Sequence, residues 1–189
     1  PRRGAPVTAQ AVLQEAAPYL DELELRLARA VEHCPGIVAA VGRNAVDAGG
    51  KRLRPLLVHL TSRDREQALR AGVAIELAHV ATLVHDDLID GAELRRGQAS
   101  AWHAHGANAA RTGGDYLFAR AFAGLAEGGD LDGVEILARA CLSIVRGEAM
   151  QRLQLHDPTT RLDAYFERIE LKTGRLFEAS CLLGSRDRR

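Results

Sequence analysis

Three aspartates near the middle of the chain, Asp86, Asp87 and Asp90, have the residue type and spacing needed to bind a divalent cation. On a helix, residues four apart lie on one face, so the carboxylates of Asp86 and Asp90 would be neighbours. Like charges at that spacing destabilise an isolated helix, and a bound cation would offset the repulsion. Magnesium takes oxygen ligands, usually one or two carboxylates together with substrate phosphates. The pattern favours a magnesium site, although a charged helix terminus explains a bare DDxxD equally well.

Basic residues form a second cluster at GGKRLRP (49–55). Two glycines allow a tight turn and a close approach of the backbone to a ligand. Lys51 provides a mobile charge and Arg54 a rigid fork, and both suit phosphate oxygens. Taken alone, a basic turn is more often solvated surface. Arg95 and Arg96 follow the aspartates closely, so acids and arginines could together clamp a diphosphate group.

Long helices are needed to hold these residues, and the apolar spacing predicts them. Helical intervals between apolar residues run from Leu20 to His33, Glu66 to Asp90, Leu131 to Leu155, and about Arg161 to Leu183. Glycine pairs, including Gly113–Gly114, are expected to separate the elements. No useful alternating strand pattern competes. The sequence therefore predicts a single all-α domain over residues 1–189, with Lys172 and Thr173 on the last helix adding a cation and a hydroxyl.

Composition narrows the functional classes. Hydrophobic residues make up 47% and charged residues 26%, as in a soluble globular protein. Lys plus Arg and Asp plus Glu number 25 each, so no net positive field favours nucleic acid. No uninterrupted apolar run is long enough to cross a bilayer, and no signal-type core follows the basic N-terminus. We expect a cytoplasmic protein that is not transmembrane and whose cysteines are free thiols.

Six motifs, taken in order, resemble the trans-isoprenyl diphosphate synthase family. They are GGKRLRP (49–55), HDDLID (85–90), RRG (95–97), GDYLF (114–118), GEAMQ (147–151) and KTG (172–174). The resemblance extends from about Val12 to about Gly184. It implies a bundle of long helices around a central cavity, usually in a homodimer. It also implies the magnesium-dependent, head-to-tail joining of isopentenyl diphosphate to an allylic diphosphate.

The same resemblance assigns roles to individual residues. Those implied to be catalytic are Asp86, Asp87, Asp90, Lys172 and Thr173, with Asp86 and Asp90 holding the Mg²⁺. Arg95 would contact the allylic diphosphate, Gln151 would face the metal or the cavity, and the isopentenyl diphosphate would be bound by Lys51, Arg54, His79 and Arg96. The small Ala81, five residues before Asp86, leaves the family's product tunnel open and favours a medium or long product.

One feature departs from the family pattern. Family members carry a second aspartate-rich motif on a later helix, and no DDxxD follows Asp90 here. We therefore expect an incomplete domain without the C-terminal helices, whose exposed apolar faces are covered in a homodimer or by a complementary chain.

Two other functions are compatible with parts of the pattern. A non-catalytic subunit or truncated paralogue would bind substrate or a partner chain without turnover. A di-iron carboxylate bundle would use the ExxH motif formed by Glu76 and His79, but such proteins need two of these motifs and the sequence has one.

Overall fold

The computed structural model describes residues 8–32, 34 and 36–186, and most of this part of the chain is helical. The α-helices are α1 (Ala9–Glu32), α2 (Ile37–Asp47), α3 (Leu53–Thr61), α4 (Arg65–Asp90), α5 (Ala101–His105), α6 (Ala107–Glu127), α7 (Leu131–Leu153), α8 (Leu162–Ile169) and α9 (Arg175–Ser185). A π-helical turn, η1 (Glu170–Gly174), joins α8 to α9. The predicted all-α class is confirmed. The predicted end of the first helix at His33 lies outside the described residues.

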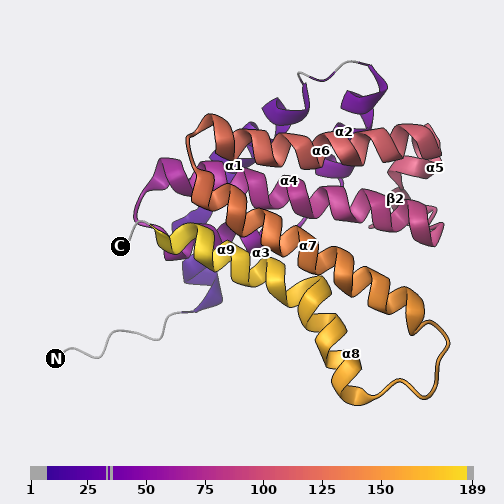
Figure 1. The fold of residues 1–189 in the computed structure, drawn as a ribbon. Helices are drawn as coiled ribbons and strands as arrows, with labels where there is room; N and C mark the ends of the chain where they lie inside the picture. The colour runs from indigo at the N-terminus through magenta and orange to yellow at the C-terminus, as the bar shows by residue number, and fades with distance from the viewer. Residues whose placement is uncertain (1–7, 33, 35, 187–189) are drawn as a thin grey trace.

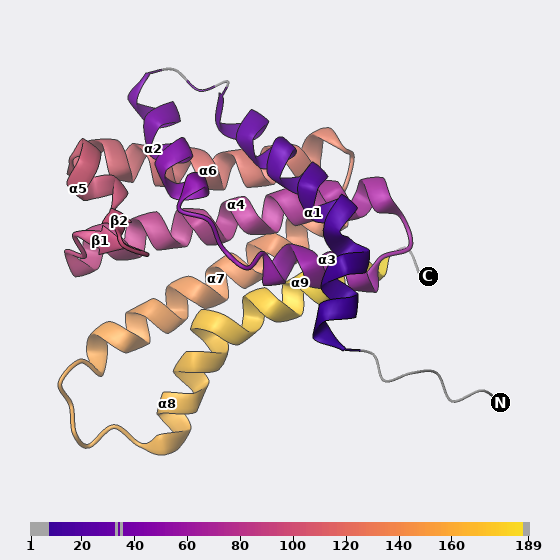
Figure 2. The ribbon, with the colours of Figure 1, turned by 180° about the vertical axis from the view of Figure 1, so that it is seen from behind.

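Helix α4 lies in the middle of the bundle, between α6 and the pair α7 and α9 (Figures 1 and 2). Asp64 caps its N-terminus by accepting hydrogen bonds from the backbone N–H groups of Glu66 and Gln67. Gly91 ends it in the left-handed conformation, with φ 66°. Buried residues occur around most of its circumference, as in a helix enclosed by a core.

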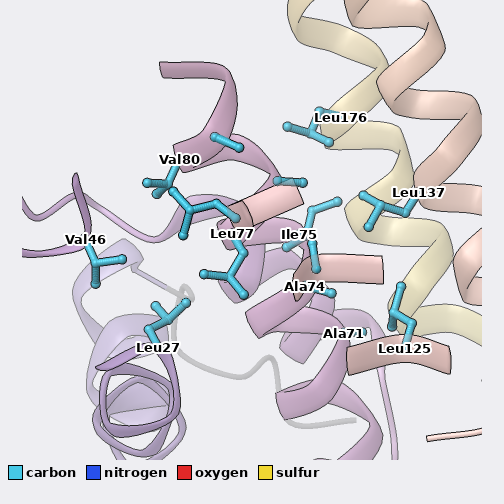
Figure 3. Packing of buried hydrophobic residues seen from close by; sticks show 14 of the residues in the cluster. Leu27, Val46, Ala71, Ala74, Ile75, Leu77, Val80, Leu125, Leu137 and Leu176 are labelled. Carbon is cyan, nitrogen blue, oxygen red and sulfur yellow. The ribbon is translucent and has the colours of Figure 1, made fainter. Parts of the chain in front are cut away.

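Within the described residues, the hydrophobic core joins α4 to α1, α2, α3, α5, α6, α7 and α9. Figure 3 shows side chains from α1, α2, α6, α7 and α9 meeting those of α4; the labelled residues are Leu27, Val46, Ala71, Ala74, Ile75, Leu77, Val80, Leu125, Leu137 and Leu176. This packing fixes the rotation of α4, and so determines where the carboxylates near its C-terminal end point.

Among the described helices, α4 alone is long and apolar enough to cross a membrane by length and composition. The sequence had predicted no apolar run long enough to cross a bilayer, because Arg70 and Glu76 interrupt the apolar residues of α4. The mean hydropathy of the helix nevertheless stays within the range of membrane-spanning helices. About 67% of its most apolar 18-residue window is buried inside the protein, as in a core helix.

Gly113 and Gly114 do not end a helix, contrary to the prediction, but lie inside α6. A Cβ atom on Gly113 would collide with Val41 of α2, and one on Gly114 would collide with His85 of α4. The glycines therefore allow α6 to approach both helices closely. A short antiparallel hairpin of β1 (Leu94–Arg95) and β2 (Gln98–Ala99) follows α4 directly, and it was not predicted from the sequence.

Helix α8 and the turn before it extend away from the rest of the bundle (Figure 1). None of its eight residues is buried, and Leu162 and Phe166 are exposed. Helix α7 also carries exposed apolar side chains, among them Leu142 and Val145.

Candidate active site

Three carboxylates and two cations gather where α4, α7 and η1 meet. We call this group the carboxylate cluster; its members are Asp86, Asp90, Glu148, Arg152 and Lys172. The Lys172 ammonium donates to Glu148 Oε2 at 2.6 Å and lies 3.7 Å from Asp86 Oδ2. Arg152 donates from Nη2 to Asp90 Oδ1 at 2.8 Å and from Nε to Glu148 Oε1 at 3.0 Å. These ion pairs connect α4, α7 and η1, which are far apart in the sequence.

Close packing of η1 on α7 places Lys172 in this cluster. A Cβ atom on Gly147 would lie 2.7 Å from the Lys172 backbone nitrogen, so the absence of a side chain allows the contact. Gln151, one turn further along α7, accepts a weak hydrogen bond from Lys172 at 3.4 Å. Thr173 is exposed on the same π-helical turn.

The protonation of the cluster follows from its burial and its charges. Burial raises the pKa of the Asp86 carboxyl; Lys172 opposes this shift, whereas Glu148 and Asp90 add to it. Burial alone would raise the pKa of Glu148 as well, but hydrogen bonds from Lys172 and Arg152 lower it below its usual value. Asp86 is thus the carboxylate whose charge is least compensated, and an added cation would favour its ionised form.

Asp87 lies in a different environment from Asp86 and Asp90. Its side chain is only 5% exposed and forms a two-pronged ion pair with the guanidinium of Arg95, with Arg95 Nε 3.0 Å from Asp87 Oδ2. The pair ties the C-terminal end of α4 to strand β1. Its hydrogen bond with Asp87 raises the pKa of Arg95, to which Asp86 and Asp90 also contribute. Of the three aspartates, therefore, Asp87 positions Arg95, while Asp86 and Asp90 face the cluster.

The predicted basic residues meet at a second site on the same helix bundle. A cavity of about 420 Å³, which we call the basic cavity, is lined by Gly50, Lys51, Arg52, Leu53, Arg54, Glu76, His79 and Arg96. The four residues predicted to bind isopentenyl diphosphate therefore lie together in this cavity; they are Lys51, Arg54, His79 and Arg96. His79 and Asp86 are seven residues apart on one face of α4, about 10 Å along the helix axis.

Arg54 is held by an aromatic ring. Its guanidinium carbon lies 4.5 Å from the ring centroid of Phe177 on α9, a cation–π contact. Its Nε is buried and has no hydrogen-bond partner among the described residues, and burial lowers the pKa of the group. A half-buried guanidinium with an unused donor is suited to an anionic ligand.

Arg52, between Lys51 and Arg54, has a structural role. It is buried in a left-handed conformation with φ 47°, and it bonds to Glu24, Glu76 and the carbonyl of Val46. These bonds join α1, α2 and α4 behind the basic turn. They also occupy the carboxylate of Glu76, which argues against the di-iron alternative.

His79 is neutral at physiological pH. Burial, followed by the charges of Arg54, Arg96, Arg52 and Arg95, lowers its pKa to about 3. It therefore lines the basic cavity as an uncharged imidazole, able to donate one hydrogen bond and accept another.

No group of three or more His, Cys, Asp or Glu side chains within residues 8–32, 34 and 36–186 is arranged to hold a metal ion. Asp86 and Asp90 still fit magnesium, because that ion often takes only one or two carboxylates and completes its shell with phosphate oxygens and water. The cationic groups of Lys172 and Arg152 already lie against these carboxylates.

Reasoning from the sequence did not identify Glu148, Arg152 and Phe177. Glu148 lies within the GEAMQ motif and is four residues from Arg152, a spacing that predicts an ion pair but not its contact with α4. No local pattern distinguishes Phe177 from other apolar residues of α9.

Comparison with known proteins agrees with this fold and site. The family model described as polyprenyl synthetase matches residues 35–186. Heptaprenyl diphosphate synthase component 2 of Geobacillus stearothermophilus is 39% identical over 170 residues, covering 88% of this chain and 53% of that protein. Octaprenyl diphosphate synthase of Escherichia coli (strain K12) is 35% identical over 148 residues, 76% of this chain and 46% of that protein.

Among solved structures, polyprenyl synthase from Caulobacter crescentus CB15, in complex with calcium and isoprenyl diphosphate, superposes with a TM-score of 0.88 at 33% identity. The match covers 98% of this chain and 57% of that one. The fold is thus that of the isoprenoid synthases. The chain belongs to the polyprenyl synthetase family, and it spans about half the length of the curated relatives it matches.

Proposed function

We propose that this protein joins isopentenyl diphosphate head to tail to an allylic diphosphate, in a magnesium-dependent reaction that yields a medium- or long-chain polyprenyl diphosphate. One observation carries the proposal: the carboxylate cluster and the basic cavity lie about two turns apart on one face of α4. Condensation needs two diphosphates held near each other, one by metal and one by protein cations. The names of the relatives support this class of reaction.

Each end of the site suits a different diphosphate. In the basic cavity, Lys51, Arg54 and Arg96 would bind the isopentenyl diphosphate, with neutral His79 adding a hydrogen bond. In the carboxylate cluster, Asp86 and Asp90 would hold Mg²⁺, which when bound neutralises the negative charge of a leaving diphosphate.

Lys172 and Arg95 would contact the allylic diphosphate, with Gln151 and Thr173 beside Lys172. Their charges would stabilise the diphosphate as it leaves.

Two features support a medium- or long-chain product. Ala81, the small residue one and a half turns before Asp86, adds no bulk below the carboxylate cluster. The relatives quoted above are named as heptaprenyl and octaprenyl diphosphate synthases.

A second candidate is a non-catalytic subunit that binds substrate or a partner chain. It is favoured by a relative named as one component of a heptaprenyl diphosphate synthase. In either case we propose that the exposed apolar side chains of α7 and α8 are covered in a homodimer or by a complementary chain.

Turnover separates the two candidates. The full chain is incubated with Mg²⁺, farnesyl diphosphate and radiolabelled isopentenyl diphosphate, and the label in extractable lipid is counted. We expect labelled polyprenyl product from the wild type and at least a hundredfold less from Asp86→Ala, because the variant lacks a metal ligand (roughly 3 kcal/mol of transition-state stabilisation). A folded wild-type chain that binds both diphosphates without forming product would support the non-catalytic candidate instead.

A further inference from the structure

Arg152 joins two helices at the open end of the carboxylate cluster. Glu148 is one turn before it on α7, and Asp90 is at the last turn of α4. The guanidinium donates to both, at 3.0 Å to Glu148 Oε1 and 2.8 Å to Asp90 Oδ1. Because two carboxylates from different helices hold it, its position is determined by tertiary structure as well as by its own helix.

This contact uses an oxygen of Asp90 that a divalent cation would also need. The Asp90 side chain is 50% exposed and that of Arg152 is 41% exposed, so solvent reaches the pair and can screen it. Breaking such an exposed ion pair requires little free energy. The opened pair would leave Asp90 Oδ1 able to turn towards Asp86.

The net charge of the cluster also favours cation binding when Arg152 moves away. With the charged side chains of Arg152 and Lys172 both present, the five side chains of the cluster carry a formal charge of minus one. Without Arg152 the formal charge is minus two. A divalent cation is attracted more strongly to the second arrangement. Lys172 lies deeper, between Glu148 and Asp86, so Arg152 is the cation that contacts Asp90.

We propose that Arg152 competes with the divalent cation for Asp90, so that cation binding requires the Arg152–Asp90 ion pair to open. Arg152 is on this account a positioning residue: it holds Asp90 towards α7 in the free protein and sets how tightly the cation binds. The inference rests on the proposed function in one respect, the use of Asp86 and Asp90 as cation ligands.

The test measures Mn²⁺ binding to the full chain by electron paramagnetic resonance of the free ion, without substrate. We expect Arg152→Gln to bind Mn²⁺ with a roughly three- to fivefold lower Kd than wild type, the size expected for one partly exposed ion pair. Arg152→Lys keeps the charge and should stay near the wild-type value.

Arg139→Gln is the matched control. It removes one positive charge from the same helix, where Arg139 pairs with Glu135, and it lies about 20 Å from Arg152 along the helix, beyond the screening length at 0.1 M salt. Its Kd should equal that of the wild type.

A double-mutant cycle separates competition at Asp90 from a general field effect. In an Asp90→Asn background, Arg152→Gln should tighten Mn²⁺ binding by clearly less than it does in the wild type, because only the change in net charge remains. Equal Kd values for wild type and Arg152→Gln, or the same gain in the Asp90→Asn background, would overturn the inference while leaving the metal site in place. If Asp90→Asn binds Mn²⁺ as tightly as wild type, both the inference and the metal ligands of the proposed function are wrong.

Discussion

Single residues in this site differ in role even where they are identical in type. Asp86 and Asp87 are adjacent, yet Asp86 faces Lys172 while Asp87 is buried against Arg95. Likewise Arg52 is fully engaged by Glu24 and Glu76, whereas Arg54 keeps a buried donor unused. Helix geometry causes the difference between the two aspartates, because neighbouring side chains point about 100° apart; Arg52 precedes α3 in a left-handed conformation, whereas Arg54 lies within it.

His79 should stay uncharged throughout the physiological pH range. Its pKa of about 3 in the folded protein is below the unfolded value of 6.5, so the unfolded state binds more protons between these values. The resulting stability is fully present above about pH 6.5 and is lost as the pH falls towards 3. We expect urea denaturation to show that the loss from pH 7 to pH 4 is smaller in His79→Gln, by up to about 3 kcal/mol.

The matched variant for this prediction is His85→Gln, which changes an imidazole on the same helix outside the basic cavity. If His79→Gln and wild type lose stability equally between pH 7 and pH 4, the imidazole of His79 is not held neutral by its surroundings.

Phe177 should affect isopentenyl diphosphate binding through its contact with Arg54. Phe177→Leu removes the ring beneath the guanidinium and costs about 0.5–2 kcal/mol of cation–π energy. We expect isothermal titration calorimetry to show isopentenyl diphosphate binding weakened about three- to tenfold, with Phe177→Tyr near wild type. Weakening by Phe177→Tyr as large as by Phe177→Leu would mean that packing, not the aromatic face, holds Arg54.

Elements bring these residues together over long sequence separations. Much of the helical framework is predictable from the sequence: the predicted and observed bounds of α4 differ by one residue at the N-terminus, and those of α7 by two at the C-terminus, because both carry sustained helical periodicity. Helix α6 was not predicted, because Gly113 and Gly114 were interpreted as a break between elements. In the structure these two glycines allow close helix packing and do not form a turn.

The candidate site was predictable only in part, for a physical reason. Asp86, Asp90 and Lys172 follow from their motifs, and Lys172 does lie beside Asp86. The contacts of Arg152 with Asp90 and of Phe177 with Arg54 depend on how α7 and α9 pack, and no local spacing encodes them.

Gly147 determines how closely η1 approaches α7. In Gly147→Ala the new methyl group would lie 2.7 Å from the Lys172 backbone nitrogen, and backbone cannot move aside as a flexible side chain can. We expect a loss of about 1–3 kcal/mol in the free energy of unfolding, measured by urea denaturation, as in other overpacked sites. Gly124→Ala on α6, where the added carbon meets nothing within 4 Å, is the control and should not be destabilised.

At the scale of the whole molecule, the exposed apolar side chains of α7 support the interface proposed above. Leu142 and Val145 are 62% and 66% exposed and are three residues apart, so they share one face of the helix. An apolar face of this kind is costly in water unless it is covered.

The chain should therefore self-associate through α7 in the absence of a partner. We expect sedimentation velocity to show a concentration-dependent shift from monomer to dimer, weakened in Val145→Glu because the interface would bury an unpaired charge. Leu13→Glu, at an exposed apolar position of α1, is the control and should behave as wild type. A wild-type chain that stays monomeric at every concentration would contradict this assignment of the α7 face.

We propose that one face of α4 serves two separate diphosphate sites, and a ternary binding experiment can distinguish two sites from one. The full chain is titrated by calorimetry with isopentenyl diphosphate and with an unreactive thiolo analogue of an allylic diphosphate, in Mg²⁺. We predict that both bind at once, that Asp86→Ala weakens the allylic analogue alone, and that Arg54→Ala weakens isopentenyl diphosphate alone, each by at least tenfold. Mutual exclusion of the two ligands, or loss of both in either variant, would contradict the claim.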